Sequence, residues 1–407
     1  MTHCSSCGAR RSLPRLLVLT PSELTRDPRA RRQVVAARRE GLDVVGMCGR
    51  VAGVDAAPLD GVSVVRVGGD EVSERLRRTG LGAGGSEAPR PLVRELRGLY
   101  RLVRLGALTR RLVSAGRRAG PFAIVHANDF DTLPAAWLLA RQWEARLVYD
   151  AHEVYADQEP NPPRIFRGAT AAAEGWLARR ADTVVTVSPS LASELKSRLG
   201  LRRTPRSVLN APELLTEEPP PAPADGPLRV IYQGAAGVGA RPFHDVIAAS
   251  SSAGEDVEIT LRVVRVDLEE LRRLVRDSGA AGRIQVVAPV PPDRLLEGLF
   301  GFHVGLIINR PATLTDELAL PNKLFEYMMA GLAVVAPRLP GVAPLVEGEG
   351  IGVTFEPGRT DRLAAALATL AGDRARLGAM RARARQLALE RYNAESQQDV
   401  LADVWKA

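Results

Sequence analysis

Cysteine is scarce in this chain of 407 residues, which has three: Cys4, Cys7 and Cys48. A small and odd number of cysteines excludes a disulfide framework and is typical of a reducing compartment. Cys4 and Cys7 form a CxxC pair beside His3, but a structural zinc site needs four ligands and no second cysteine pair follows. We therefore interpret this pair as part of an incidental N-terminal tail and expect no metal there.

Long hydrophobic runs and aromatic residues are also lacking. No window approaches about eighteen uninterrupted apolar residues, and the first residues contain no hydrophobic stretch of the kind that a signal peptide needs. The net charge is +8, with a pI near 9.9, but aromatic residues make up only 4% and none alternates with arginines as in single-strand nucleic-acid platforms. We therefore expect a cytoplasmic protein that binds no nucleic acid.

Lysine is the third scarce residue type: arginine supplies all the cationic side chains except Lys196, Lys323 and Lys406. Between Arg90 and Arg118 the chain has nine arginines and one acidic residue, and leucines and valines alternate with them at near-helical spacing. This pattern predicts a basic amphipathic helix. It leaves two interpretations open, a solvated arginine face over leucines that face the core, or a surface that docks on an anionic membrane or an acidic partner.

The overall composition, with 45% hydrophobic and 25% charged residues, is typical of a soluble globular protein. The length of 407 residues favours two domains. Short β-rich runs alternate with helical patterns on both sides of a proline-rich segment, which predicts βαβ units and two parallel sheets. The expected strands cover residues 16–20, 44–48, 62–67, 123–126, 147–150, 183–187 and 207–210, then 228–232, 257–264, 284–288, 304–308, 333–336 and 352–355.

Four segments follow from this alternation. We expect an N-terminal domain over residues 1–211, a proline-rich linker over 212–227 and a second domain over 228–390. The last segment, 391–407, is predicted to be a helix that crosses back to the first domain. Two facing α/β domains leave a cleft, and ligands of open parallel sheets bind beyond the carboxyl ends of the strands.

The most informative motif is the segment from Leu320 to Gly331. A proline at its start sets a turn, a helix begins at once, and Gly331 ends the helix. The unpaired amides of the first helical turn attract phosphate, and Lys323 adds a full positive charge at the same end. Glu326, one turn further along, fits a carboxylate that accepts hydrogen bonds from a sugar diol, or else an acid that only complements the helix dipole.

A glycine-rich strand-to-helix turn covers residues 232–241 and would let a phosphate approach the backbone at Gly234. It lacks the lysine and serine or threonine of a phosphate-binding loop, which disfavours a nucleoside triphosphatase. The turn after the first strand has no dinucleotide fingerprint, which disfavours a nicotinamide cofactor. Polar residues also follow the expected strands of the first domain: His126, Asp129, Asp150, His152 and Glu153. None of these groups has a convincing metal spacing.

The sequences Pro321-Asn322-Lys323-Leu324-Phe325-Glu326-Tyr327 and Ala330-Gly331-Leu332-Ala333-Val334-Val335, with Gly341-Val342 and Glu347-Gly348, resemble glycosyltransferase family four. In the first domain His126-Ala127-Asn128-Asp129, Tyr149-Asp150-Ala151-His152-Glu153 and Val187-Ser188 resemble strand-end motifs of a subgroup. The resemblance spans nearly the whole chain. It implies the GT-B fold, in which two facing Rossmann-like, doubly wound parallel-sheet domains enclose a central cleft.

The resemblance also implies roles for single residues. Glu326 would bind the ribose of the donor, Lys323 would contact its diphosphate, and His152 would face the transferred sugar. The remaining implied donor contacts are Gly234, Pro321, Asn322 and Leu324, and the implied acceptor-facing or sugar-facing residues are Asp27, Arg29, Asn128, Asp129 and Glu153.

Two departures from the family pattern matter. The family usually has two glutamates separated by seven residues, but Leu318 occupies the earlier position and Glu317 is one residue out of register. The family often has an arginine after the glycine of the second domain's first strand and a lysine further on. Here Ala235 follows the glycine and Arg241 takes the place of the lysine, so the diphosphate charge would be met by Arg241 and Lys323.

We therefore expect a metal-independent glycosyltransferase, without a required cofactor, that moves a sugar from a nucleoside diphosphate sugar to an acceptor with retention of anomeric configuration. A UDP-sugar is favoured as donor. The acceptor is a secondary-metabolite or carrier-tethered scaffold, or a lipid or cell-envelope intermediate reached from the inner face of the membrane. Arg241 and Lys323 would stabilise the leaving diphosphate and His152 would orient the sugar. The alternatives are a nucleotide-sugar epimerase of the same fold and a non-catalytic nucleotide-sugar-binding protein.

Overall fold

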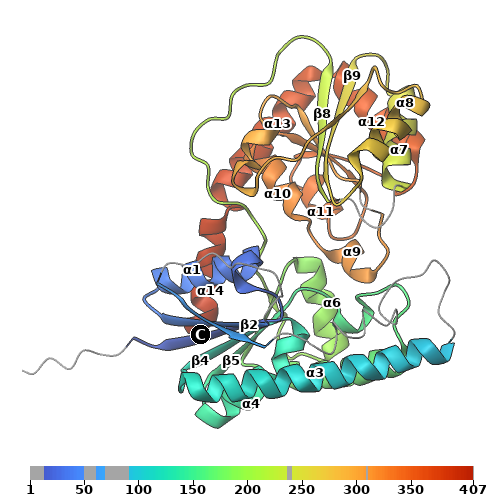
Figure 1. The fold of residues 1–407 in the computed structure, drawn as a ribbon. Coiled ribbons are helices and arrows are strands. Elements are labelled where there is room, and N and C mark those ends of the chain that lie inside the picture. The colour runs from blue at the N-terminus through green and yellow to red at the C-terminus, as the bar shows by residue number, and fades with distance from the viewer. Residues whose placement is uncertain (1–12, 50–60, 69–90, 236–240, 309, 407) are drawn as a thin grey trace, which may run out of the picture.

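The computed structural model describes residues 13–49, 61–68, 91–235, 241–308 and 310–406, which form two α/β domains, one above the other in Figure 1. Cys4 and Cys7 lie outside the described residues. The sheet of the first domain has the strand order β3-β2-β1-β4-β5-β6-β7 and is parallel throughout. Its strands are β1 (Arg15–Thr20), β2 (Asp43–Gly49), β3 (Ser63–Val67), β4 (Ile124–Asn128), β5 (Arg146–Ala151), β6 (Thr183–Thr186) and β7 (Arg206–Ser207).

The helices of the first domain lie on both faces of this sheet. They are α1 (Pro28–Arg39), α3 (Pro91–Ala119), α4 (Asp129–Trp143), α5 (Arg164–Ala178) and α6 (Pro189–Leu199), with short 3-10 turns at Leu24–Arg26 and Tyr155–Asp157. Two buried clusters, one on each face of the sheet, form the core of this domain.

The second domain repeats the arrangement with the strand order β10-β9-β8-β11-β12-β13, again parallel. Its strands are β8 (Leu228–Ala235), β9 (Val257–Val264), β10 (Ile284–Val287), β11 (Val304–Leu306), β12 (Ala333–Pro337) and β13 (Gly352–Phe355). Its helices are α7 (Arg241–Ser252), α8 (Leu268–Asp277), α9 (Leu314–Leu318), α10 (Asn322–Met329), α11 (Ala343–Val346), α12 (Thr360–Gly372) and α13 (Arg374–Glu390), with 3-10 turns at Pro292–Arg294 and Glu297–Leu299.

The prediction of two parallel sheets is confirmed, and the reason is visible in the central strands. Five of the six residues of β1 are buried, as are all five residues of β4 and of β12. Strands covered by helices on both faces read as continuous apolar runs, which is the pattern that the sequence shows. The run expected at 207–210 is shorter than predicted, because only Arg206–Ser207 pairs with β6.

The chain crosses between the domains twice. Residues 208–227 contain no helix or strand and lead into β8. After Asn393 the last helix, α14 (Ala394–Lys406), packs against α1, and the Trp405 indole donates a hydrogen bond to His126 Nδ1 at 3.1 Å. Figure 1 shows α14 beside α1 in the lower domain, although it follows the helices of the upper one.

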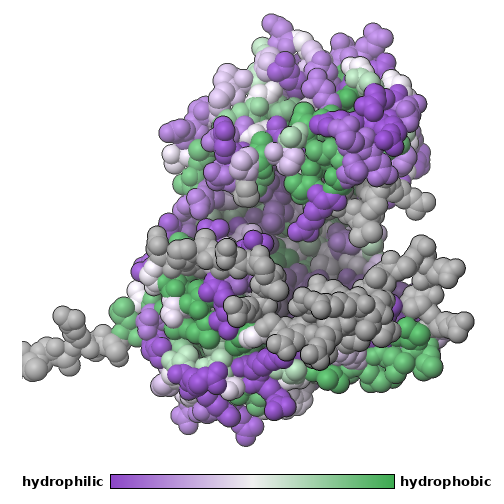
Figure 2. All heavy atoms as spheres, in the orientation of Figure 1, coloured by the Kyte–Doolittle hydropathy of each residue, from purple (hydrophilic) through white to green (hydrophobic). Residues whose placement is uncertain are grey.

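The two domains also touch at α9. Leu314, Leu318 and Ala319 pack against the core of the first domain, although they belong to the second. The Ser188 hydroxyl donates to the Leu318 carbonyl at 2.7 Å, and the Val154 amide donates to Thr315 Oγ1 at 3.1 Å. Beyond this contact the molecule is hollowed between its domains (Figure 2).

Candidate active site

The strand order of each sheet reverses direction at one point, between β1 and β4 in the first domain and between β8 and β11 in the second. Open α/β sheets bind ligands at such points, beyond the carboxyl ends of the strands. In the second domain this place holds a cavity of about 450 Å³. Its lining comes from the ends of β8 and β9, the segment after β10 and the start of α10: Gln233, Gly234, Ala235, Arg262, Val264, Pro289, Val290, Leu295, Asn322, Lys323 and Glu326.

Lys323 contributes one positive charge to this cavity from the first turn of α10. Its Nζ lies 4.0 Å from the centre of the Tyr232 ring, a cation–π contact. Burial lowers the pKa of Lys323 from 10.5 to about 8, and the charge of Glu326 only partly opposes this shift. The ammonium is therefore desolvated and available to an incoming anion.

Glu326 lies one turn further along α10 and lines the same cavity. Burial raises the pKa of this carboxyl group, against the opposite influence of Lys323 and Arg32. Arg32 belongs to α1 of the first domain, and burial lowers its pKa to about 10. The charges of Arg32 and Glu326, which belong to different domains, thus influence each other's pKa.

Arg262 is a cavity residue that the sequence analysis missed. It lies near the end of β9 and its Nη1 donates to the Gln233 side chain at 2.7 Å and to the Gly298 carbonyl. Its buried Nε has no partner among the described residues. The signal in the sequence was its place on the polar positions of an alternating strand, where it follows Glu258 and Thr260, two residues before the strand ends.

The glycine-rich turn meets the cavity at Gly234, which has a φ of 127°. A Cβ atom there would lie 3.4 Å from Lys323 Cε and 3.5 Å from its Nζ, so the glycine keeps the backbone close to the ammonium. Residues 236–240 lie outside the described residues. Arg241 begins α7, and its side chain lies outside the described part of the chain as well.

The other expected donor residues occupy different positions. Asn322 lines the cavity and Pro321 precedes α10 without any side-chain cap, which leaves the first helical amides of α10 without that partner. Leu324 is not placed to contact a donor in the cavity. Its side chain is fully buried, and its N–H donates to the Pro321 carbonyl. Glu317 lies on α9 and is not among the described residues that line the cavity.

In the first domain Asp129 and His152 form a pair at the carboxyl ends of the adjacent strands β4 and β5. His152 Nδ1 lies 3.1 Å from Asp129 Oδ1, and both side chains are 22% exposed. Burial alone would lower the pKa of His152, but the charges of Asp129 and Asp150 outweigh it and raise the pKa from 6.5 to about 10. Asp129 has a φ of 61°, a costly backbone conformation that tends to occur at functional sites.

Asp150 lies beneath this pair, fully buried, and holds it in place. It accepts hydrogen bonds from Arg29 at 2.7 and 2.8 Å and from Gln33 at 2.6 Å, and His152 Nε2 lies 3.6 Å away. Burial opposes ionisation, but the Arg29 charge and the histidines hold the pKa of Asp150 well below its usual range. Asp150 therefore acts together with Asp129 to keep His152 charged.

Several expected acceptor-facing residues are structural here. Arg29 is 6% exposed and binds Asp150 and the Val208 carbonyl, so it does not line the cleft as the resemblance implied. Asn128 is fully buried and bonds to Gln33 and the Leu19 carbonyl. The Asp27 side chain caps the first turn of α1. The polar groups of these three residues form hydrogen bonds within the first domain. Their role is therefore to hold the site residues in position.

His126 is the second histidine at this sheet edge, but it is fully buried. Burial lowers its pKa, and Nδ1 accepts the hydrogen bond from Trp405. His126 is therefore a neutral core residue, whereas His152 is charged. Glu153 follows His152, and burial together with the charge of Asp129 raises its pKa to about 7. Within the described ranges no three histidine, cysteine or acidic residues are placed to hold a metal ion.

Comparisons with known proteins identify the family of both domains. Residues 26–211 match the model of the glycosyl transferase 4-like domain, and residues 238–373 match that of glycosyl transferases group 1. A curated relative, the UDP-N-acetylglucosamine–N-acetylmuramyl-(pentapeptide) pyrophosphoryl-undecaprenol N-acetylglucosamine transferase of Nitrobacter hamburgensis, is 26% identical over 290 residues, which are 66% of this chain and 69% of the relative.

Solved structures show the same fold. Sucrose-phosphate synthase from Thermosynechococcus elongatus has a TM-score of 0.71 at 15% identity, covering 97% of this chain and 98% of its own. Anabaena HepE in complex with UDP has a TM-score of 0.70 at 14% identity, covering 97% of this chain and 100% of its own. The fold is therefore GT-B, as expected, and the chain belongs to the group 1, family-four-like glycosyltransferases.

Proposed function

We propose that this glycosyltransferase takes its sugar from a nucleoside diphosphate sugar bound in the cavity of the second domain. The observation that carries the proposal is that Lys323 and Glu326, one helical turn apart, line the same cavity as the backbone of Gly234. A cation and a glycine turn suit a diphosphate, and a carboxylate one turn away suits the ribose diol. A UDP-sugar is the favoured donor, because HepE, which has a similar fold, was solved with UDP and with UDP-glucose.

The leaving diphosphate gains negative charge as the bond to the sugar breaks. Lys323, the first amides of α10 and Arg262 surround the place where that charge develops, and Arg241 begins the helix after the glycine turn. Positive groups that are already desolvated and oriented stabilise such charge strongly. This chemistry asks for no metal ion, and we propose that the transfer is metal-independent.

The sugar would extend from the second domain toward the first, where Asp129 and His152 close the cleft. We propose that the cationic His152 donates a hydrogen bond to a sugar hydroxyl through Nε2, the ring nitrogen that has no hydrogen-bond partner among the described residues. It orients the sugar and is not the nucleophile. Retention of anomeric configuration is part of this proposal, by family resemblance.

The acceptor would bind to the first domain, near Glu153. We propose a lipid or cell-envelope intermediate, at the inner face of the membrane, and support comes from the curated relative, whose printed acceptor is linked to pyrophosphoryl-undecaprenol. A secondary-metabolite scaffold or an intermediate tethered to a carrier protein would instead show transfer that is independent of any membrane.

The donor assignment is tested by thermal shift with a panel of nucleoside diphosphate sugars. A donor at about 100 times its dissociation constant should add about 2.7 kcal/mol to the free energy of unfolding. Lys323→Met and Glu326→Ala should remove most of this gain. Lys196→Met, at an exposed position of α6, is the matched control and should retain it. Unchanged donor affinity in both cavity variants would contradict the proposal.

The reaction type is tested with the bound donor. A transferase releases the nucleoside diphosphate only when an acceptor is present, and NMR of the product gives its anomeric configuration. An epimerase would convert the donor sugar without any acceptor. A non-catalytic binding protein would show the thermal shift but no turnover with any acceptor.

A further inference from the structure

One face of α3 carries large apolar side chains that the rest of the described structure leaves uncovered. Leu92, Leu96, Leu99 and Val103 are 72%, 55%, 44% and 69% exposed. At 100° per residue these four positions fall within about 60° of one another, and they extend over about 16 Å of helix. We call this row the apolar ridge. The green surface at the lower right of Figure 2 lies over this half of α3.

The ridge is not the side of α3 that packs on the domain. Gly98 lies against Pro163, Gly116 lies against Leu139, and Leu112 is fully buried. The expected stripe of core-facing leucines is therefore split: Leu102, Leu105 and Leu108 pack on the core, whereas the ridge faces outward. The interpretation in which the leucines face the core beneath a solvated arginine face is therefore wrong for the ridge residues, which are exposed.

Further along α3, Arg110 and Arg117 fall in line with the apolar ridge at 100° per residue. A pocket of about 1020 Å³ lies between α3 and β3, and four arginines of α3 surround it: Arg110, Arg111, Arg117 and Arg118. We call it the arginine pocket. Its apolar side is formed by Val65, Val67 and Leu138, and none of the described residues that line it is acidic.

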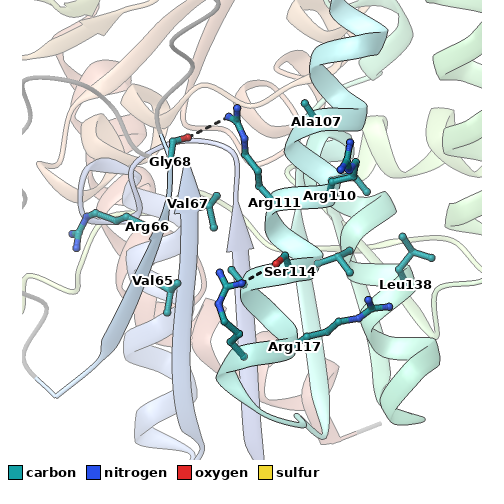
Figure 3. A pocket seen from close by; sticks show the side chains of 14 residues that line it. Val65, Arg66, Val67, Gly68, Ala107, Arg110, Arg111, Ser114, Arg117 and Leu138 are labelled. Atoms are coloured by element: carbon teal, nitrogen blue, oxygen red, sulfur yellow. Dashed lines mark hydrogen bonds between the residues drawn. The ribbon is translucent and has the colours of Figure 1, made fainter.

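The arginines are arranged by neutral partners. Arg111 reaches the Gly68 carbonyl at 3.4 Å, as Figure 3 shows, and Arg118 donates to Ser114 Oγ at 2.8 Å. Arg117 donates to the Gln142 side chain at 2.8 Å. Arg66, the other arginine at the pocket, points away from α3 in Figure 3 and pairs with Glu23. Among the described residues, therefore, no acidic side chain neutralises the charges of the α3 arginines within the pocket.

We propose that this face of α3 binds an anionic phospholipid bilayer. Lipid phosphates occupy the arginine pocket, and the apolar ridge inserts at the boundary between head groups and acyl chains. Each cation near such a surface increases the affinity roughly fivefold, and an apolar side chain moved out of water adds to this. A symmetric contact between two copies through α3 would instead bring like charges together, because the segment 90–118 has nine arginines and one glutamate.

The orientation of α3 gives this surface a consequence for the acceptor. Glu95 accepts hydrogen bonds from the amides of Arg164 and Ile165, and Arg101 pairs with Glu159 at 2.8 Å. These partners follow His152 along the chain, so the ridge lies at the carboxyl edge of the first sheet. Resting on the proposed function, a bilayer held by the ridge would present a lipid-linked acceptor to the edge that carries Asp129 and His152.

The test is sedimentation of the full-length protein with vesicles, without donor or acceptor. The protein should bind vesicles of phosphatidylcholine with added phosphatidylglycerol at least about tenfold more tightly than vesicles of phosphatidylcholine alone. The ridge variant Leu96→Ser/Val103→Ser and the pocket variant Arg110→Gln/Arg117→Gln should each lose at least about tenfold in affinity. Arg202→Gln/Arg203→Gln removes the same charge from another exposed segment and should stay close to the parent protein.

Three results would overturn the proposal. The parent protein could fail to prefer anionic vesicles, or the Arg202/Arg203 control could lose as much affinity as the pocket variant, which would leave net charge as the cause. The ridge variant could also turn a dimer into a monomer in sedimentation velocity with unchanged vesicle binding, which would make the ridge an interface between copies. The thermal shift with a nucleotide sugar is measured for every variant and reports separately on folding and on the donor site.

Discussion

The ammonium group of Lys323 lies over the ring of Tyr232, 4.0 Å from its centre, and not against a carboxylate. An aromatic face stabilises a cation less than a full counter-charge does, so the charge remains available to a ligand. The pKa of Lys323 is about 8, because burial favours the neutral amine and no close counter-charge fully offsets this effect. Donor binding should therefore depend on pH through this one group.

We predict that the affinity for a UDP-sugar is constant between pH 7 and 7.5 and falls by up to about tenfold per pH unit above pH 8. Below its pKa Lys323 is charged and attracts the diphosphate, and above it the charge is lost. Isothermal titration at several pH values measures this slope. Lys323→Arg should bind without the slope, because arginine stays charged throughout. An identical slope in that variant would place the titrating group elsewhere.

Gly234→Ala should weaken donor binding and destabilise the second domain by about 1–3 kcal/mol, because a non-glycine residue is strained at a φ of 127°. The added methyl group also stands beside the Lys323 ammonium. Gly378→Ala, on the exposed side of α13 with open space around it, is the matched control and should be neutral or slightly stabilising. Urea denaturation and titration with UDP measure the two effects, and equal behaviour of both variants would refute the prediction.

Asp150→Asn should cost about 3–5 kcal/mol of stability, because it leaves the buried guanidinium of Arg29 without a counter-charge. The substitution keeps the size of the side chain, so the loss reflects charge. It should also lower the pKa of His152, which NMR titration of the ring detects. Asp403→Asn, on the exposed side of α14, serves as a control for removal of one carboxylate and should change neither quantity.

The charge of His152 should make stability depend on pH. Its folded-state pKa of about 10 lies above the ordinary value of 6.5, so the stabilisation is complete below about pH 6.5 and is lost as the pH rises toward 10. His152→Gln should flatten the stability profile between these values, measured as the urea midpoint. His244→Gln, in α7 of the second domain, should leave the profile as it is in the parent protein. A parent profile that is already flat would show that His152 is neutral.

Thr315→Val should slow transfer without changing donor affinity. It removes the oxygen that accepts the Val154 N–H, two residues after His152, and loosens the contact of α9 with the first domain. The lost bond corresponds to about 1 kcal/mol, or roughly a fivefold effect. Steady-state kinetics and donor titration separate the two quantities. Thr369→Val, exposed on α12, should alter neither. A fall in donor affinity alone would assign α9 to the donor cavity.

The fold could be predicted from the sequence because buried parallel strands read as short apolar runs, and the proline-rich segment separates two series of them. Lys323 and Glu326 could also be predicted to share a site, since a single helix places residues one turn apart on neighbouring positions. Local sequence patterns were sufficient to predict the fold and this donor site. The candidate site residues of the first domain were predicted with the help of the family resemblance.

Contacts between distant segments could not be predicted in this way. Arg29 and Asp150 are 121 residues apart in the chain, and only their burial in one network shows that Arg29 positions the site and does not line the cleft. Arg262 reached the donor cavity through strand pairing, and Arg32 approached Glu326 only because the domains face each other. No short sequence pattern predicts these contacts, because each depends on which helices and strands pack together.

By itself, the sequence determined the two sheets, the helix that carries Lys323 and the existence of an amphipathic helix over residues 91–119. Only the tertiary structure decided which of that helix's apolar residues are covered, and that Asp129 and Asp150 both face His152. Periodicity reports that one side of a helix is apolar, whereas burial depends on the neighbours that the folded chain brings to it.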